Sequence, residues 1–166
     1  MWDIDDNHKI LFRGTLQKIR LISNNVVFGP IPEPNDLIEQ RLTINRLGHV
    51  WLSYYAFGNG FGEHKCAKTE RLFLDKDAVQ RIFDAFTYSF TDYQELLMTT
   101  DVGDWEMTLT NTDKVQFKLL GCLVRYDSQN TAMLSDMLRK ELNHHDLYAF
   151  DGGEYEEDEE DKNWED

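Results

Sequence analysis

Apolar and polar residues alternate along two stretches of the chain in the way that is typical of β-hairpins. The first predicted hairpin turns at residues 46–49, and its alternating apolar positions are Leu42, Ile44, Val50, Leu52 and Tyr54. The second turns at residues 111–114, and its apolar positions are Met107, Leu109, Val115, Phe117 and Leu119. The two sets superpose without a gap, Leu42 on Met107, so an internal repeat is possible.

Each predicted hairpin is followed by a segment with helical periodicity. Residues 79, 82, 83, 86 and 90 are all apolar, and Asp75 stands where a helix N-cap is expected. A second apolar stripe covers residues 133–142, after a cap at Ser128 or Asn130. The sequence therefore predicts an α+β fold: an antiparallel sheet built from β-hairpins, with two main helices packed on it.

The other segments carry weaker signals. Residues 8–29 read as two strands that turn at Asn24 and Asn25, and the three prolines of residues 29–34 read as an extended connector. Asn35 is a candidate cap for a short helix to residue 40. A glycine-rich loop at residues 58–62 precedes a predicted strand over 68–74.

The charge of the chain is concentrated at its C-terminus. Of the formal net charge of −14 over 166 residues, about −8 lies in residues 154–166, which contain nine carboxylates and one lysine. Such a segment repels itself and has few apolar groups, so we expect one folded domain over residues 1–152 and a disordered acidic tail over 153–166. Residues 1–153 still carry 22 acidic and 16 basic side chains, a net of −6, which predicts a moderately acidic domain.

Composition also bears on location and partners. No apolar run is long enough for a transmembrane helix, and the acidic N-terminus does not resemble a signal peptide, so a cytoplasmic location is expected. The two cysteines are expected to be reduced. The nearest basic cluster, formed by Lys9, Arg13, Lys18 and Arg20, is small beside the total charge, which argues against direct nucleic-acid binding.

No catalytic or metal-binding signature is present. His64 and Cys66 with His144 and His145 lack the recurrent spacing of a zinc site. The glycine loop lacks the helix and the lysine of a phosphate-binding loop. Glu141, Asp146 and Asp151 could be combined with a histidine into an acid–base site, but nothing in the sequence fixes their geometry. We therefore expect no catalytic residues, no metal and no cofactor.

Four segments of the C-terminal half resemble a small uncharacterised bacterial α+β domain. These are residues 104–113 (DWEMTLTNTD), 117–123 (FKLLGCL), 135–139 (SDMLR) and 146–152 (DLYAFDG). The resemblance covers residues 66–152 approximately. The chain departs from that pattern at Lys114, where the turn has glycine, at Cys122, where serine is usual, and at the helix exit with His144 and His145. The resemblance implies no activity.

These observations favour a non-enzymatic acidic binding protein. The main hypothesis is an inhibitor or regulator of a basic nucleic-acid-binding protein or nuclease, by the logic of DNA mimics and anti-CRISPR proteins. The alternative is a regulatory or scaffold domain that binds a protein through an aromatic hairpin face. An enzyme is the least favoured reading. The predicted partner-binding residues are Glu154, Glu156, Glu157, Asp158, Glu159, Glu160, Asp161, Trp164, Tyr55, Phe57 and Phe61.

Overall fold

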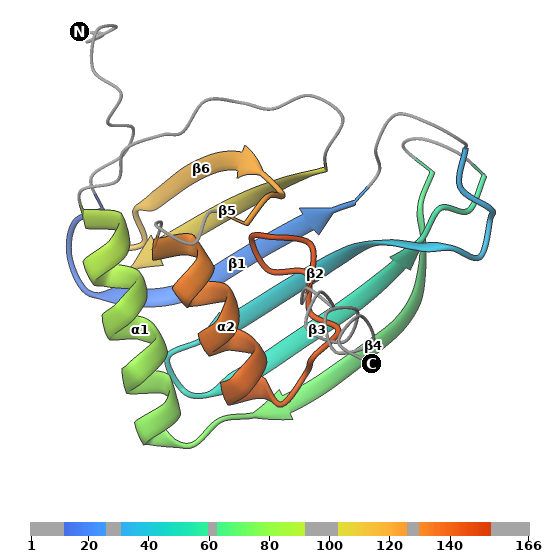
Figure 1. Cartoon of the computed structure of the whole chain (residues 1–166). Helices are drawn as coiled ribbons and strands as arrows, with labels where there is room; N and C mark the ends of the chain where they lie inside the picture. Colours follow the sequence, from blue (N-terminus) through green and yellow to red (C-terminus); the bar gives the residue numbers. More distant parts are fainter. Residues whose placement is uncertain (1–11, 26–30, 60–62, 92–102, 126–129, 154–166) are drawn as a thin grey trace, which may run out of the picture.

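A computed structural model describes residues 12–25, 31–59, 63–91, 103–125 and 130–153 of the chain. These residues form six strands and two helices (Figure 1). In chain order the elements are β1 (Leu16–Asn24), β2 (Leu37–Asn45), β3 (His49–Ala56), β4 (Lys65–Phe73), α1 (Lys76–Thr91), β5 (Asp104–Asn111), β6 (Gln116–Cys122) and α2 (Asn130–Leu142). The predicted α+β class, with an antiparallel sheet and two main helices, is confirmed.

The strands form one sheet in the order β4-β3-β2-β1-β5-β6, and every neighbouring pair is antiparallel. Strands β1 to β4 make a meander, and the β5–β6 hairpin joins it along the free side of β1. Both hairpins that alternation predicts are present, as β2–β3 and β5–β6. Val50 is buried whereas Val115 is half exposed, and the internal repeat stays a prediction.

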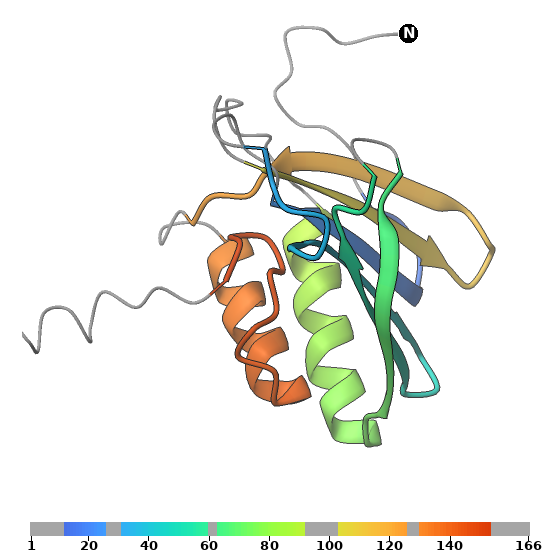
Figure 2. The same ribbon diagram turned by 90° about the vertical axis from the view of Figure 1, so that its right-hand side faces the viewer.

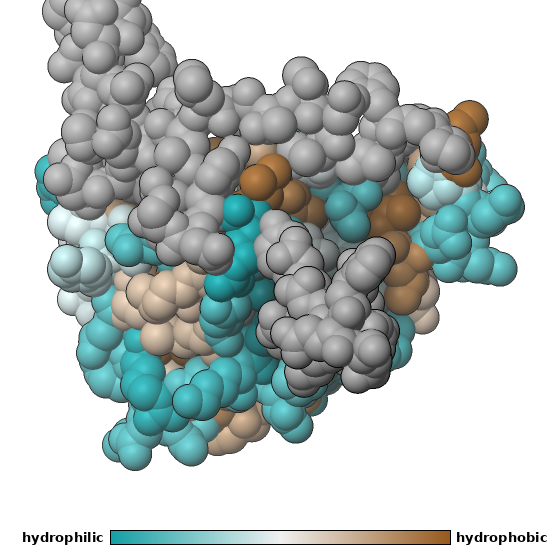
Figure 3. Space-filling model, in the orientation of Figure 1, coloured by the Kyte–Doolittle hydropathy of each residue, from teal (hydrophilic) through white to brown (hydrophobic). Residues whose placement is uncertain are grey.

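Both helices pack on the same face of the sheet (Figure 2). Helix α1 is capped as predicted by Asp75, whose Oδ1 accepts a hydrogen bond of 2.8 Å from the amide of Ala78. Ile82, Phe83, Phe86 and Phe90 are almost fully buried on the sheet-facing side of α1. The surface over the helices is mixed in character, with hydrophilic residues around a paler, weakly apolar area (Figure 3).

One prediction for the N-terminal part is wrong, and a second lies partly outside the described residues. The short helix from Asn35 to residue 40 does not form, because strand β2 starts at Leu37 and is paired on both sides. Residues 33–36 instead close a tight turn, in which the amide of Asp36 donates to the carbonyl of Glu33. Of the predicted pair of strands over 8–29, the described residues contain β1, and the rest of the prediction, over residues 8–11 and 26–29, lies outside them.

The segment after α2 closes the helix-covered side. The side-chain oxygen of Gln40 accepts from the amide of Tyr148 at 2.7 Å, and its nitrogen donates to the carbonyl of Asp146 at 2.9 Å. The hydroxyl of Ser23 donates to the carbonyl of Ala149 at 2.6 Å. These bonds fix residues 146–149 against β1 and β2, so no described helix or segment is left to cover the opposite face of the sheet.

Candidate binding face on the open side of the sheet

Only one of the predicted partner-binding residues lies on a described surface. Tyr55 is partly exposed on the open face, with the guanidinium of Arg41 4.1 Å from its ring centroid. Phe57 is buried, with 5% of its surface exposed, so its prediction as a contact residue is wrong. Phe57 follows the end of β3, where alternation no longer applies, and its amide donates to the carbonyl of Asp36. Phe61 and the predicted tail residues, 154–161 and Trp164, lie outside the described residues.

The charge of the described part differs from that of the whole chain. Of the 31 acidic and 17 basic side chains, 15 of each lie in described residues, so this part is neutral. The other 16 acidic and two basic side chains, which make up the net −14, lie in residues 1–11, 92–102, 126–129 and 154–166. The net charge of −6 over residues 1–153 therefore lies in residues 1–11, 92–102 and 126–129, and the described residues carry no net charge.

Strand register aligns the outward side chains of the open face into rows across the sheet. We call the first of these the basic row: Arg71, Trp51, Thr43, Arg20, Thr108 and Lys118. The turn row lies beside it, at the end of the sheet with the β2–β3 turn: Phe73, His49, Asn45, Lys18, Thr110 and Gln116. The two rows together, which we call the basic half, contain four cations and no carboxylate.

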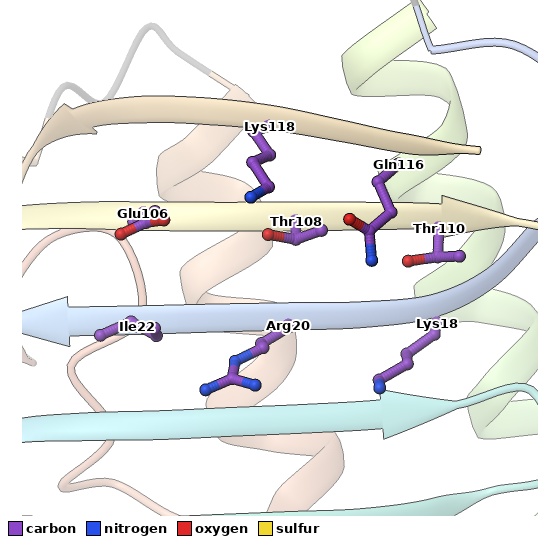
Figure 4. Close-up of a pocket in the computed structure, with 8 residues that line it drawn as sticks. All are labelled: Lys18, Arg20, Ile22, Glu106, Thr108, Thr110, Gln116 and Lys118. Carbon is purple, nitrogen blue, oxygen red and sulfur yellow. The ribbon is translucent and has the colours of Figure 1, made fainter. Parts of the chain in front are cut away.

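An open pocket of ≈ 290 Å³ lies where β1, β5 and β6 run side by side, mostly within the basic half and reaching Ile22 and Glu106 at its border (Figure 4). It is lined by Lys18, Arg20, Ile22, Glu106, Thr108, Thr110, Gln116 and Lys118. Lys18, Arg20 and Lys118 extend over the sheet on the side away from the helices (Figure 4). Among the described residues, no carboxylate lies within ion-pair distance of these three cations. Their charges therefore face solvent together.

Aromatic rings gather at the β3–β4 side of the basic half. The ring centroid of His49 lies 5.9 Å from that of Trp51 and 5.5 Å from that of Phe73. Phe73 is 69% exposed, which is unusual for so large an apolar side chain. The aromatic hairpin face of the alternative hypothesis thus exists, but it is made of His49, Trp51 and Phe73 together with Tyr55.

The other half of the open face is acidic. Glu39, Asp104 and Glu106 point outward from β2 and β5, and the only described cation among them, Arg41, pairs with Glu39 at 2.7 Å. Burial, with the nearby charges of Glu106 and Glu39, raises the pKa of Asp104. Acidic and basic groups are therefore segregated along the strands, and an anionic ligand is favoured only on the basic half.

The residues considered for acid–base chemistry are occupied by structural pairs. His144 Nε2 lies 2.6 Å from a carboxylate oxygen of Glu70, which ties the exit of α2 to β4. Glu141 forms a bidentate pair with Arg81 that joins the two helices. Asp151 is held by Arg139 and Arg125. In the described ranges, no three His, Cys, Asp or Glu side chains are grouped in a way that could hold a metal ion.

The segments that carry the family resemblance meet in one structural cluster. The ring of Trp105 lies against Gly121, its cross-strand partner, and meets the ring of Phe150 edge-on at 4.8 Å. Ser135 accepts a hydrogen bond of 3.1 Å from the amide of Phe150. Asn111 holds the 111–115 turn by accepting from the amides of residues 113 and 115. These motif residues build the fold and leave the open face to other positions.

Sequence reasoning noted two members of the basic half, Lys18 and Arg20, but set them aside as too few. It missed Lys118 and Arg71, which come from strands 98 and 51 residues away from Arg20 along the chain. The available signal was alternation, because each of these residues occupies an outward position of its strand. That these cations share one face of the sheet follows only from the order and register of the strands, which the sequence does not display.

No helix in the described part of the chain has the length and apolar character needed to cross a membrane. Comparisons of the chain with protein-family models, with curated proteins and with solved structures give no match.

Proposed function

We propose that this protein is a non-enzymatic binding protein that engages another macromolecule through the open face of its sheet. The observation that supports this most is the basic half, where four cations, three aromatic rings and hydrogen-bonding side chains share a face that no described element covers. Exposed aromatic and basic groups beside polar ones are the composition of recognition surfaces.

The acid–base candidates support the non-enzymatic reading. The polar groups of Glu141, His144 and Asp151 are each engaged in a hydrogen bond or ion pair between elements of the fold. The pocket of the basic half is open and is lined by lysine, arginine and threonine side chains, with Glu106 as its one carboxylate. Such a lining suits the binding of an anionic group better than proton transfer.

A site-specific photocrosslinker tests this proposal. A benzophenone amino acid replaces Thr108, in the pocket, or Tyr88, which is 79% exposed on α1, as the control position. We expect a defined crosslinked species from a native lysate with the probe at 108 and not at 88. That species should disappear when K18Q, R20Q and K118Q are added. Equal crosslinking from both positions, or capture that is insensitive to the three substitutions, would contradict the use of this face.

The distribution of charge favours a second candidate function. The entire net charge of −14 lies outside a neutral framework, with the largest share in residues 154–166. We propose, as this second candidate, that these carboxylates engage a basic nucleic-acid-binding protein or nuclease and inhibit or regulate it. Tyr155 and Trp164 would supply apolar contacts within the acidic segment.

Neutralising the tail in the full-length protein tests the second candidate. The variant carries E156Q, E157Q, D158N, E159Q, E160Q and D161N, and the K18Q/R20Q/K118Q protein is the comparison. We expect the tail variant to lose a basic partner, with the remaining affinity less sensitive to salt. If the tail variant still retained that partner at high salt, the proposal that the tail carboxylates bind it electrostatically would be refuted.

A cytoplasmic location belongs to the same proposal. Cys66 and Cys122 lie at opposite ends of one cross-strand row, five strand spacings or about 24 Å apart. That separation is far beyond the reach of a disulfide between the two, which supports a reducing compartment.

A further inference from the structure

We infer that the basic half of the open face is a binding site for single-stranded nucleic acid. The inference rests on the proposed function and specifies the partner of that same face. The expectation against direct nucleic-acid binding relied on the net charge of the whole chain. Because the described framework is neutral and its charges are segregated, that net charge does not describe this face.

The cations are arranged to follow a phosphodiester backbone. Lys18 and Arg20 are two residues apart on β1, about 7 Å, and Lys118 lies two strands from Arg20, about 10 Å. Arg71 lies three strands away on the other side, about 14 Å from Arg20. Four charges along and beside one row can contact successive phosphates of a single bound strand, whereas one small anion would meet only the three around the pocket.

The rings provide the second requirement, a surface on which bases can stack. Trp51 lies in the basic row between Arg71 and Thr43, and His49 and Phe73 lie beside it in the turn row. Stacking on aromatic side chains beside a positively charged track is the usual way in which proteins hold single strands. The bases of a duplex are already paired and stacked, so a duplex could use the cations alone.

Polar side chains complete the site. Asn45, Thr43, Thr108, Thr110 and Gln116 offer donors and acceptors on the same two rows. An acidic protein segment would also satisfy the cations, but its carboxylates gain nothing from the half-buried ring of Trp51 and the exposed ring of Phe73. The combination of cations without a carboxylate partner in the described part of the chain, rings and neutral hydrogen-bonding groups therefore favours nucleic acid over an acidic peptide.

Fluorescence anisotropy with the full-length protein tests this inference. The probes are fluorescein-labelled oligo(dT) and oligo(U) of about 12 nucleotides, a length within the range that one such surface holds. A labelled duplex of the same length and a poly-glutamate peptide serve as the competing ligand classes. The variants are K18Q/R20Q/K118Q and W51A, with W51F as the conservative replacement. The matched control is K65Q/K76Q/K140Q, which has the same net charge as the first triple variant and removes exposed lysines outside the basic half.

The expected result is saturable single-strand binding that depends on both charge and rings. With four cations on phosphates, the slope of log K against log salt should be about −2.8, and about −0.7 after removal of three. W51A should weaken binding by about fivefold or more, while W51F keeps most of it. The control triple should bind as the wild type does. Urea unfolding of every variant establishes that each one is folded.

Several outcomes would overturn the inference. These are no saturable binding to either oligonucleotide, equal loss in the control triple, no effect of W51A, or binding of the duplex or poly-glutamate as tight as that of the single strands. If oligonucleotide binding fails while the Thr108 crosslink persists and depends on Lys18, Arg20 and Lys118, the inference is wrong and the proposed function stands. If both fail, the open face is not the binding surface.

Discussion

Removal of the Arg139 guanidinium should be among the most damaging single changes to the described framework. The side chains of Arg139 and Asp151 are 3% and 1% exposed and form a bidentate ion pair. Arg139 Nε also donates to the carbonyl of Leu147 at 2.9 Å. This one side chain therefore connects α2 to the closing segment that packs against the sheet. We consider Arg139→Met, which keeps the length and the apolar stem of the side chain.

The expected cost follows from what remains buried after the change. Removing one partner of a buried ion pair costs about 3–5 kcal/mol, because the other charge is left without its counter-ion. Arg125 still contacts Asp151 at 3.2 Å, and its side chain is 21% exposed, so it offsets part of that loss. The carbonyl of Leu147 also loses its donor, at about 1–3 kcal/mol. We therefore expect the free energy of unfolding to fall by about 4 kcal/mol.

Urea denaturation followed by tryptophan fluorescence measures this loss, because Trp105 packs edge-on against Phe150, next to Asp151. The double variant R139M/D151M should lose less than the sum of R139M and D151M, since it leaves no buried charge behind. A loss below about 1 kcal/mol for R139M, or strict additivity in the double variant, would refute the reasoning.

Three other changes test separate features. Lys114 has φ = 68° in the 111–115 turn, so K114G should raise the free energy of unfolding by about 0.5–1 kcal/mol in urea denaturation, and a decrease would mean that the lysine side chain stabilises the turn. A Cβ at Gly121 would lie less than 2.5 Å from the Trp105 ring, so G121A should cost about 1–3 kcal/mol and change the near-UV circular dichroism of the indole; an unchanged spectrum would contradict that packing. Although partial burial opposes it, hydrogen bonds to the Leu142 carbonyl and the Glu70 carboxylate raise the pKa of His144, and the same contact lowers the pKa of Glu70. This pair therefore stabilises the fold fully between pH 4.5 and 6.5, the unfolded-state pKa values of the two groups, and its contribution declines as the pH rises through the pKa of folded His144. The wild type should lose more stability than H144Q between pH 6.5 and 8. Equal stability profiles of the two proteins over that pH range would contradict the assignment.

Local periodicity was sufficient to predict most of the secondary structure. The stripe from Val79 to Phe90 and the alternation around the two hairpin turns each extend over enough residues for burial to determine the element. The segment at 35–40 is too short for that. Its cap signal at Asn35 was outweighed by the hydrogen bonds that β2 gains from β1 and β3.

The candidate site could not be predicted in the same way, because it depends on which strands are neighbours. Arg20, Thr108 and Lys118 lie in one row only because β5 pairs with β1, a contact between residues almost 90 positions apart. A shift of one residue in either pairing would move an entire strand's outward set to the helix side. Composition was misleading for a related reason, since a total charge averages over segments that the fold keeps apart.

The two proposed functions require opposite effects from the same variant. If the basic half binds single strands, the carboxylates of residues 154–166 repel that ligand, and neutralising them should tighten oligonucleotide binding most at low salt, where the screening length is longest. If the tail binds a basic protein, the same neutralisation should weaken that complex under the same conditions. The K18Q/R20Q/K118Q protein should show the reverse in both assays, because it becomes more negative while it loses the phosphate contacts. Measured together, the two variants therefore separate the contributions of the basic half and the tail, because the sign of the change in each binding affinity differs between them whatever its size.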